Sequence, residues 1–495
     1  MGGALTQPVT DKASNQGEGL GLRYGLSSMQ GWRSEMEDDH DVKVGLNHGL
    51  DDWSFFAVFD GHAGKCAASY AAWNLLDFIL RDRQFKLETS EWLGPVTIGP
   101  LGEINDPSEE GGGERIGDEE RGRKEQIPDA DEAPSISSEI PKLEITDVQP
   151  TLTGLPSRQE SSKTKEETEL SSGEQDQPNT DQELRSSAQE KKKSIDQEDE
   201  VSKPKFASFP VIMQLEMVKK AIKSGFLRID QSMRTTARDM SGCTAVCALV
   251  SPTHLFIANC GDSRAVLYDG TSPKFVTEDH KPFNPKERKR IVDAGGVATQ
   301  RINGTLAVSR ALGDFEFKKD LHRGPCEQLV SPEPEVTVIE RHPQDQFLVL
   351  ACDGIWDVMN NDDLCQYINY KLMIESNLES VCDSVLDVCL RKGSRDNMSI
   401  IIVVFETGPK VLDSEIERAK KNDEKIMEIA DQLIGKDPTI SFPAFLSTLE
   451  TDFKTIHPED MLPPGAGIEA KYDLLREQFE QSNLKYFGCI PDKLT

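Results

Sequence analysis

An acidic segment without core-forming residues divides this chain and limits what it can fold into. Between Trp92 and Phe206 the sequence contains no aromatic residue, no Cys and no His. Residues 101–205 hold 28 Asp and Glu against 14 Lys and Arg, together with many Ser, Gln, Gly and Pro. Such a stretch buries too little apolar surface to offset the entropy of ordering its backbone. We therefore expect residues 101–205 to be a disordered acidic insertion, with the fold built from the sequence on either side.

The flanking sequence has the patterns of a mixed α and β domain. Helical periodicity marks residues 65–80 and 211–233, and short β-rich runs cover residues 53–60, 245–250, 255–259, 264–268, 346–352 and 399–405. Turn residues separate several of these runs at close spacing, which favours antiparallel pairing over alternating strand and helix. Beyond residue 411 the spacing of apolar residues predicts further helices, one ending near residue 435 and one over 467–481. We expect a flexible N-terminus (1–22), an α+β core (23–100 and 206–406) and a C-terminal helical module (411–490).

Composition excludes several classes of protein. The whole chain has 56 Lys and Arg against 86 Asp and Glu, a net charge of −30, which argues against a nucleic-acid binder. No stretch approaches the roughly 20 apolar residues that a membrane span needs, and no charged segment leads into an apolar run at the N-terminus. The ten cysteines are scattered without a C-x-x-C pair, as in a reduced cytosolic protein. We expect a monomer in the cytoplasm, with the nucleus as a second compartment.

Carboxylates stand at strand ends and turns along both flanking regions: Glu37, Asp38, Asp39, Asp60, Asp262, Asp353, Asp357 and Asp396. For any one of them alone the simpler interpretation is a turn-forming Asp that accepts a backbone hydrogen bond. Several such groups brought together would repel one another unless a cation neutralised them. Ligation by oxygen alone selects hard ions such as Mg²⁺ or Mn²⁺ over zinc. The pattern therefore predicts a metal site with oxygen ligands, provided that the fold joins these turns.

Eight motifs in order resemble those of the metal-dependent type 2C Ser/Thr protein phosphatases. They cover residues 23–38, 58–64, 241–246, 259–264, 278–282, 303–314, 351–357 and 393–399. The resemblance extends over about residues 22–89 and 206–405, and more loosely through the C-terminal helices. It is closest to the animal alpha and beta forms of the family, although the acidic insertion has no counterpart in them. The resemblance implies an α+β fold with a four-layer sandwich, in which helices flank two antiparallel β-sheets, and a small C-terminal helical module.

The same resemblance implies roles for individual residues. Asp60 would bridge two Mg²⁺ or Mn²⁺ ions, the carbonyl of Gly61 would bind one of them, and Asp353 and Asp396 would bind the other. Glu37 and Asp38 would hold waters around the ions. Asp262 and Asp357, with Asp353, match a weaker third-metal site of the family. Cys243 and Cys352 are expected to be core residues.

A hydrolytic mechanism follows from this set. A water bridging the two ions would lose a proton near neutral pH and attack phosphorus. Arg33 would bind two phosphoryl oxygens, and His62 would protonate the departing Ser or Thr alkoxide. The substrates would be phosphorylated proteins.

Two other functions stay open alongside this one. A catalytically silent scaffold of the same fold is one alternative, although the expected metal ligands, Arg33 and His62 are all present in the sequence. The other gives the main function to the acidic insertion, as a binding arm for basic partners; a plain solvated spacer is the simpler interpretation of that segment. At the N-terminus, Gly2 and Thr6 match the N-myristoylation pattern, and a single acyl chain gives only weak membrane contact.

Overall fold

The computed structural model describes residues 5–46, 50–82, 211–236, 240–457 and 460–487. All the elements below belong to one compact unit, formed by residues 1–101 and 202–495. The predicted acidic insertion (101–205) lies outside the described residues, so its disorder stays a prediction. Among the described helices, none combines the length and the apolar character that a membrane span requires.

Antiparallel strands form two main sheets and one small one. The first main sheet has the order β1 (Val9–Gly19), β2 (Leu22–Gly31), β14 (Met398–Phe405), β13 (Phe347–Ala351), β9 (Arg264–Tyr268) and β10 (Pro273–Val276). The second has the order β12 (Glu335–Glu340), β8 (His254–Cys260), β7 (Ala245–Val250), β4 (Leu50–Phe59) and β3 (Asp39–Leu46). The small sheet joins β11 (Leu312–Gly313), β6 (Gly242–Cys243) and β5 (Gly61–His62).

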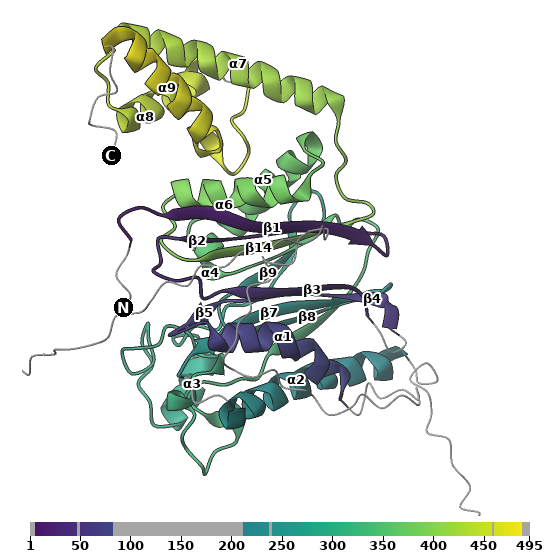
Figure 1. Cartoon of the computed structure of the whole chain (residues 1–495). Coiled ribbons are helices and arrows are strands. Elements are labelled where there is room, and N and C mark those ends of the chain that lie inside the picture. Colours follow the sequence, from purple (N-terminus) through teal and green to yellow (C-terminus); the bar gives the residue numbers. More distant parts are fainter. Residues whose placement is uncertain (1–4, 47–49, 83–210, 237–239, 458–459, 488–495) are drawn as a thin grey trace, which may run out of the picture. The chain divides into compact units, whose positions relative to one another are not determined.

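Helices cover the outer face of each main sheet. The pair α1 (Cys66–Leu80) and α2 (Val211–Thr236) packs on the five-stranded sheet, and the pair α5 (Asn361–Ile374) and α6 (Leu378–Arg391) packs on the six-stranded sheet (Figure 1). Two shorter helices, α3 (Pro285–Asp293) and α4 (Asp353–Trp356), lie in connections between strands. The four layers confirm the predicted fold class.

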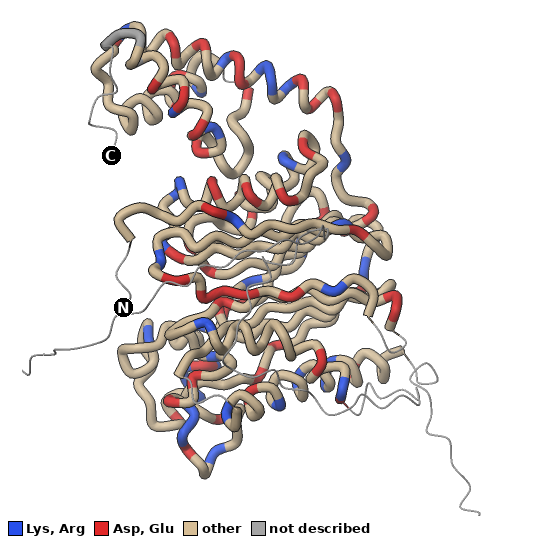
Figure 2. Tube along the Cα trace, viewed as in Figure 1, with Lys and Arg blue, Asp and Glu red and all other residues tan. Residues whose placement is uncertain are grey.

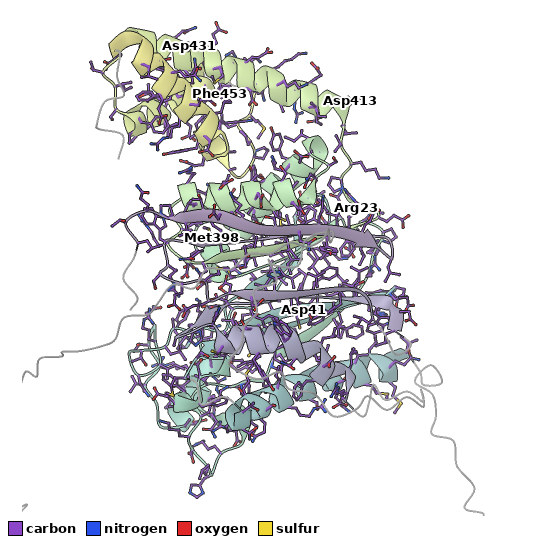
Figure 3. The ribbon with its side chains drawn as sticks, in the orientation of Figure 1. Arg23, Asp41, Met398, Asp413, Asp431 and Phe453 are labelled. Carbon is purple, nitrogen blue, oxygen red and sulfur yellow. The ribbon has the colours of Figure 1, made fainter. Side chains whose placement is uncertain are left out.

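Strand periodicity places side chains alternately in neighbouring layers. On β4, Phe55 and Phe59 belong to the core against α1 and α2, whereas Phe56 and Val58 belong to the core between the two sheets. A strand whose successive side chains point to opposite faces must be apolar throughout when both faces are covered. This explains the continuous apolar runs of the central strands. Figure 3 shows the side chains that fill these layers, with Met398 of β14 among those packed toward α5 and α6.

The prediction of a flexible N-terminus was wrong for the residues that form β1. Residues 1–22 were expected to be flexible, but Val9–Gly19 forms β1, an edge strand paired along β2. Its side chains alternate between exposed and half-buried, and none is fully buried. Backbone pairing with β2 therefore holds the strand in place, and the polar sequence carries no apolar alternation that would reveal it.

The C-terminal module has an apolar core of its own. It contains α7 (Asp413–Lys436), α8 (Phe442–Ile456), a 3₁₀ segment η5 (Gly467–Lys471) and α9 (Tyr472–Phe487), packed around aromatic side chains such as Phe453. Basic and acidic residues alternate along α7 (Figure 2). The module contacts the sandwich through Arg391 of α6, whose guanidinium lies 4.0 Å from the centre of the Tyr472 ring and 2.9 Å from Oδ1 of Asp473.

Candidate active site

Three carboxylates converge where strands of both main sheets end. Asp60 follows β4, Asp262 follows β8 in the turn after Gly261, and Asp353 follows β13 at the start of α4. One oxygen atom from each lies within 4.8 Å of the others. Asp262 is buried, and Asp60 and Asp353 are half-buried. We call these three side chains the carboxylate cluster; they bring together turns that lie far apart in the sequence.

Burial and neighbouring acids oppose the ionisation of this cluster. Burial raises the pKa of Asp60 well above its usual range, and the charges of Asp353 and Asp38 raise it further. Burial also raises the pKa of Asp353, as do the charges of Asp262 and Asp396. Buried like charges at this separation resist ionisation unless a cation sits among them. A set of oxygen donors of this kind fits Mg²⁺ or Mn²⁺.

Glu37 and Asp38, which precede Asp60 in the sequence, have different hydrogen-bond partners. Burial raises the pKa of Asp38 to about 7, against the effect of a hydrogen bond donated by the Ser399 hydroxyl at 2.8 Å. Glu37 accepts a hydrogen bond from the backbone N–H of Gly64 (2.6 Å) at Oε1. Its own N–H donates to Oδ1 of Asn397 (2.9 Å), so both neighbouring segments fix its position.

Gly61 lies where two stretches of backbone approach closely. It stands in β5 next to the cluster, and a Cβ atom built on it would lie 2.1 Å from the carbonyl oxygen of Glu37. No other residue fits at that separation without moving the backbone. The close approach keeps Gly61 and Glu37 side by side at the cluster.

Arg33 lies between two of the predicted site acids. Its Nε is 3.2 Å from Oδ1 of Asp396, and its Nη2 is 3.3 Å from Oε2 of Glu37. The structure therefore places Asp396 against Arg33 and outside the three-oxygen cluster, while its charge still raises the pKa values of Asp60 and Asp353. The Arg33 side chain is 38% exposed, which leaves it accessible to an anion.

His62 forms a pair with Asp314 that the sequence analysis did not assign. Its Nε2 lies 2.8 Å from Oδ2 of Asp314. Burial would lower the pKa of His62, but the charge and hydrogen bond of Asp314 outweigh it and raise that pKa. A Cβ on Gly242 would lie 2.5 Å from His62 Nε2, so this position must be Gly for the pair to form. The pair with Asp314 therefore favours the protonated form of the imidazole.

A second unpredicted contact reaches the cluster itself. The ammonium of Lys281 forms an ion pair with Asp262. Burial would lower the pKa of Lys281, but Asp262 and the nearby Asp353 raise it above its ordinary value. Asp357, predicted for a third-metal site, lies close enough for Lys281 and Asp262 to influence its pKa, which burial raises.

The expected core cysteines are buried. Cys243 and Cys352 are both at most 1% exposed, and burial raises the pKa of each thiol well above its usual range. A thiol that stays protonated is a poor nucleophile.

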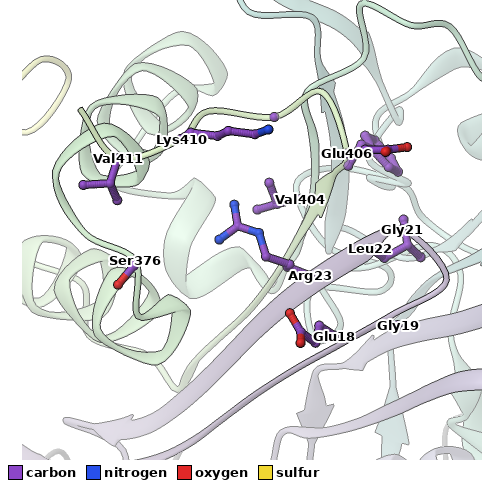
Figure 4. A pocket seen from close by; sticks show the side chains of 12 residues that line it. Glu18, Gly19, Gly21, Leu22, Arg23, Ser376, Val404, Glu406, Lys410 and Val411 are labelled. Carbon is purple, nitrogen blue, oxygen red and sulfur yellow. The ribbon is translucent and has the colours of Figure 1, made fainter.

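A separate cavity of about 670 Å³ lies at the turn between β1 and β2. It is lined by Glu18, Gly19, Gly21, Leu22, Arg23, Ser376, Val404, Phe405, Glu406, Gly408, Lys410 and Val411. Figure 4 shows the long side chains of Arg23 and Lys410 reaching into it. None of these residues belongs to the carboxylate cluster, and the lining includes two basic and two acidic side chains.

Comparison with known families and proteins gives consistent matches over most of the chain. Residues 22–93 and 151–398 match the family described as protein phosphatase 2C. Residues 399–480 match the protein serine/threonine phosphatase 2C C-terminal domain. Residues 94–150 lie between the two parts of the first match and are not covered by it. They include the first half of the predicted insertion.

Individual relatives agree with these matches. Human protein phosphatase 1B is 36% identical over 491 residues, which cover 98% of this chain and 78% of that protein. Bovine protein phosphatase 1A is 36% identical over 490 residues, which cover 98% of this chain and 96% of that protein. Among solved structures, a phosphatase from a pathogenic strain of Toxoplasma gondii is similar with a TM-score of 0.45 at 19% identity, covering 80% of this chain and 96% of that one.

Proposed function

This chain belongs to the protein phosphatase 2C family and is a metal-dependent protein serine/threonine phosphatase, and we propose which of its residues hold and use the metal. In this proposal two Mg²⁺ or Mn²⁺ ions bind at the carboxylate cluster and beside it. The residues that would hold them are Asp60 and Asp353 of the cluster, the neighbouring Gly61, and Asp396, which lies outside the cluster next to Arg33. A third ion would bind more weakly near Asp262 and Asp357, together with Asp353.

The carboxylate cluster is the observation that carries this proposal. Asp60, Asp262 and Asp353 bring three oxygens within 4.8 Å of one another at a place where burial opposes their charge. Divalent ions bound there would supply the positive charge that activates water for attack on phosphorus. Glu37 and Asp38 lie beside the cluster and can accept hydrogen bonds from waters around the ions.

The side chains of Arg33 and His62 act on the phosphate ester. Arg33 is held at the edge of the site by Glu37 and Asp396, and its planar guanidinium can bind two phosphoryl oxygens at once. Asp314 raises the pKa of His62 and so favours its protonated form. In this proposal His62 gives that proton to the departing Ser or Thr oxygen, which would otherwise leave as an unstable alkoxide.

Location and assembly are further parts of the proposal. The pattern of Gly2 and Thr6 supports N-myristoylation and transient membrane contact. Gly2 lies outside the described residues. We propose a cytoplasmic and partly nuclear enzyme that acts as a monomer on phosphorylated proteins.

Phosphate release from a phosphothreonine peptide tests the metal site. The full chain is freed of metal with EDTA, then assayed alone, with Mn²⁺ and with Mg²⁺. We expect activity only with metal, and a loss of about 10³-fold in Asp353→Asn, which is about 4 kcal/mol of transition-state stabilisation. Asp345→Asn is the matched control, because Asp345 is a buried acid that pairs with Lys274 outside the site. Metal-independent release by folded protein, or equal activity in Asp353→Asn, would reject the assignment.

A pair of substrates tests the role of His62. A general acid matters most when the leaving group is a strong base, such as the threonine alkoxide. We expect His62→Gln to slow release from the phosphothreonine peptide by about 10²-fold or more, but to affect p-nitrophenyl phosphate much less. Equal losses on both substrates would mean that His62 does not act as the acid.

A further inference from the structure

Lys281 sits in a loop that is fixed directly beside the carboxylate cluster. The backbone N–H of His280 donates to the carbonyl of Gly261 (2.8 Å), and the N–H of Gly261 donates to Nδ1 of His280 (3.1 Å). His280 itself is only 3% exposed. These reciprocal bonds tie the loop that carries Lys281 to the turn that carries Asp262.

The turn that carries Asp262 is fixed in its own right. Gly261 adopts a φ of +126°, and a Cβ built on it would lie 2.4 Å from Cβ of Thr244. The N–H of Thr244 donates to the carbonyl oxygen of Asp60 (2.9 Å). The backbone therefore holds Asp262 and Asp60 together, and Lys281 with them.

Positive charge is scarce at the cluster. Of the ion pairs in the described part of the chain, the one between Lys281 and Asp262 alone reaches a cluster carboxylate. The guanidinium of Arg33 pairs with Glu37 and Asp396 at the edge. Asp262 is 3% exposed and Lys281 is 26% exposed, so the pair is shielded from water on the side of the acid.

We propose that Lys281 is a tethered cation of the carboxylate cluster, which pairs with Asp262 and competes there with divalent metal. This inference rests on the metal site proposed above. Lys281 compensates the acids when metal is absent, and its charge weakens the hold on an ion beside Asp262 when metal is present. Lys281 is thus a positioning residue that sets the metal affinity of the site, and its removal makes the site bind more tightly.

Manganese titration of the full chain tests this role. Mn²⁺ affinity is measured by calorimetry after metal removal, and bound ions are counted by electron paramagnetic resonance. A charge within a few ångströms of a divalent ion is worth several kcal/mol at moderate dielectric, so we expect Lys281→Met to bind Mn²⁺ about tenfold or more tightly at its weakest site. Lys281→Arg keeps the charge and should stay within about threefold of the wild type.

Lys274→Met is the matched control. Lys274 pairs at 2.7 Å with Asp345, which is 2% exposed, so the variant also removes an ammonium from a buried carboxylate but does so away from the cluster. Its Mn²⁺ affinity should equal that of the wild type. Lys281→Gln, which keeps a polar end, replaces Lys281→Met if the latter fails to fold.

Each other outcome overturns the inference. Unchanged or weaker Mn²⁺ binding in Lys281→Met, with normal binding in the wild type, would show that Lys281 does not compete with metal. A raised KM for the phosphothreonine peptide at unchanged Mn²⁺ affinity would instead place Lys281 on the substrate. If the wild type itself binds no Mn²⁺, the proposed metal site fails and this inference fails with it.

Discussion

Two acidic sites in this protein differ in how many cations surround their carboxylates. Among the described residues, the carboxylate cluster of Asp60, Asp262 and Asp353 has one ion pair, between Asp262 and Lys281. At the second site, which we call the Glu287 network, one carboxylate of α3 is bound by two guanidiniums. Arg310 donates from Nη2 to Oε1 of Glu287 at 2.7 Å, and Arg290 also pairs with Glu287.

The pKa values follow this difference in neighbours. Burial opposes ionisation of Glu287, yet hydrogen bonds and charges from Arg310 and Arg290 lower its pKa to about 2. Burial and neighbouring acids instead raise the pKa of Asp60. A buried carboxylate that has its own cations is costly to remove, because its partners are then left unpaired, whereas carboxylates that lack cations leave a place for an external one. The difference separates a structural site from the proposed metal site.

The largest expected effect comes from neutralising one acid of the cluster. Asp60→Asn should lower phosphatase turnover by about 10³-fold or more, equal to about 4 kcal/mol. The same change should raise the stability of the metal-free protein by about 2 kcal/mol, because it removes a buried charge that repels its neighbours. Turnover and urea unfolding in EDTA measure the two effects. A metal-free Asp60→Asn protein less stable than the wild type would show that the cluster is not short of positive charge.

Neutralising Glu287 should instead lower the stability of the protein and leave the metal site unchanged. Glu287→Gln leaves the buried guanidinium of Arg310 and the half-buried one of Arg290 without this counter-ion. Removing one partner of a buried ion pair typically costs about 3 to 5 kcal/mol. Urea unfolding followed by circular dichroism gives the loss, and Mn²⁺ affinity should stay at the wild-type value. Glu327→Gln, at an exposed acid in the same region of the chain, is the control and should change little. A stable Glu287→Gln protein would mean that the two sites do not differ as described.

The pH dependence of unfolding tests the lowered pKa of Glu287 directly. The folded pKa of Glu287, about 2, lies below its ordinary value of 4.5. A lowered acid contributes stability that is present above the unfolded pKa and is lost as pH falls toward the folded pKa. The wild type should therefore lose up to about 3 kcal/mol from this group between pH 4.5 and 2. In Glu287→Gln that part of the slope should be missing, so the two unfolding curves should approach each other as the pH falls.

Much of the fold was predictable because the central strands are apolar on both faces. The runs at 245–250 and 264–268 coincide with β7 and β9. Strand β1 was missed because backbone pairing with β2 holds it and its side chains show no apolar stripe. Helices α5 and α6 were also missed, although each has a local signal, an Asn at the N-cap whose side chain accepts a backbone hydrogen bond.

The site was predictable in its residue types and less so in its contacts. Asp residues at strand ends indicated which acids belong to the site. The resemblance suggested Asp396 as a ligand beside Asp60 and Asp353, but the structure brings Asp262 into the cluster with these two instead. Lys281 and Asp314 lie 19 and 252 residues from their partners Asp262 and His62. Such pairs are formed by tertiary packing, and neither residue type nor local spacing indicates them. The metal roles of Asp60, Gly61, Asp353 and Asp396 stay predictions.

The smallest expected effect is at an exposed ion pair of α3, and it tests whether burial makes the Glu287 network important for stability. Lys289 lies on the same helix as Glu287 and pairs with Asp293 at 2.5 Å, but these side chains are 77% and 54% exposed. Because water screens an exposed pair, Lys289→Gln should change the free energy of unfolding by less than about 0.5 kcal/mol. Any change should vanish in 1 M NaCl, where screening acts over about 3 Å, whereas the loss in Glu287→Gln should remain. Urea unfolding at low and high salt measures both variants side by side. A large, salt-resistant loss in Lys289→Gln would show that α3 depends on its ion pairs wherever they lie, and burial would no longer explain why Glu287 matters.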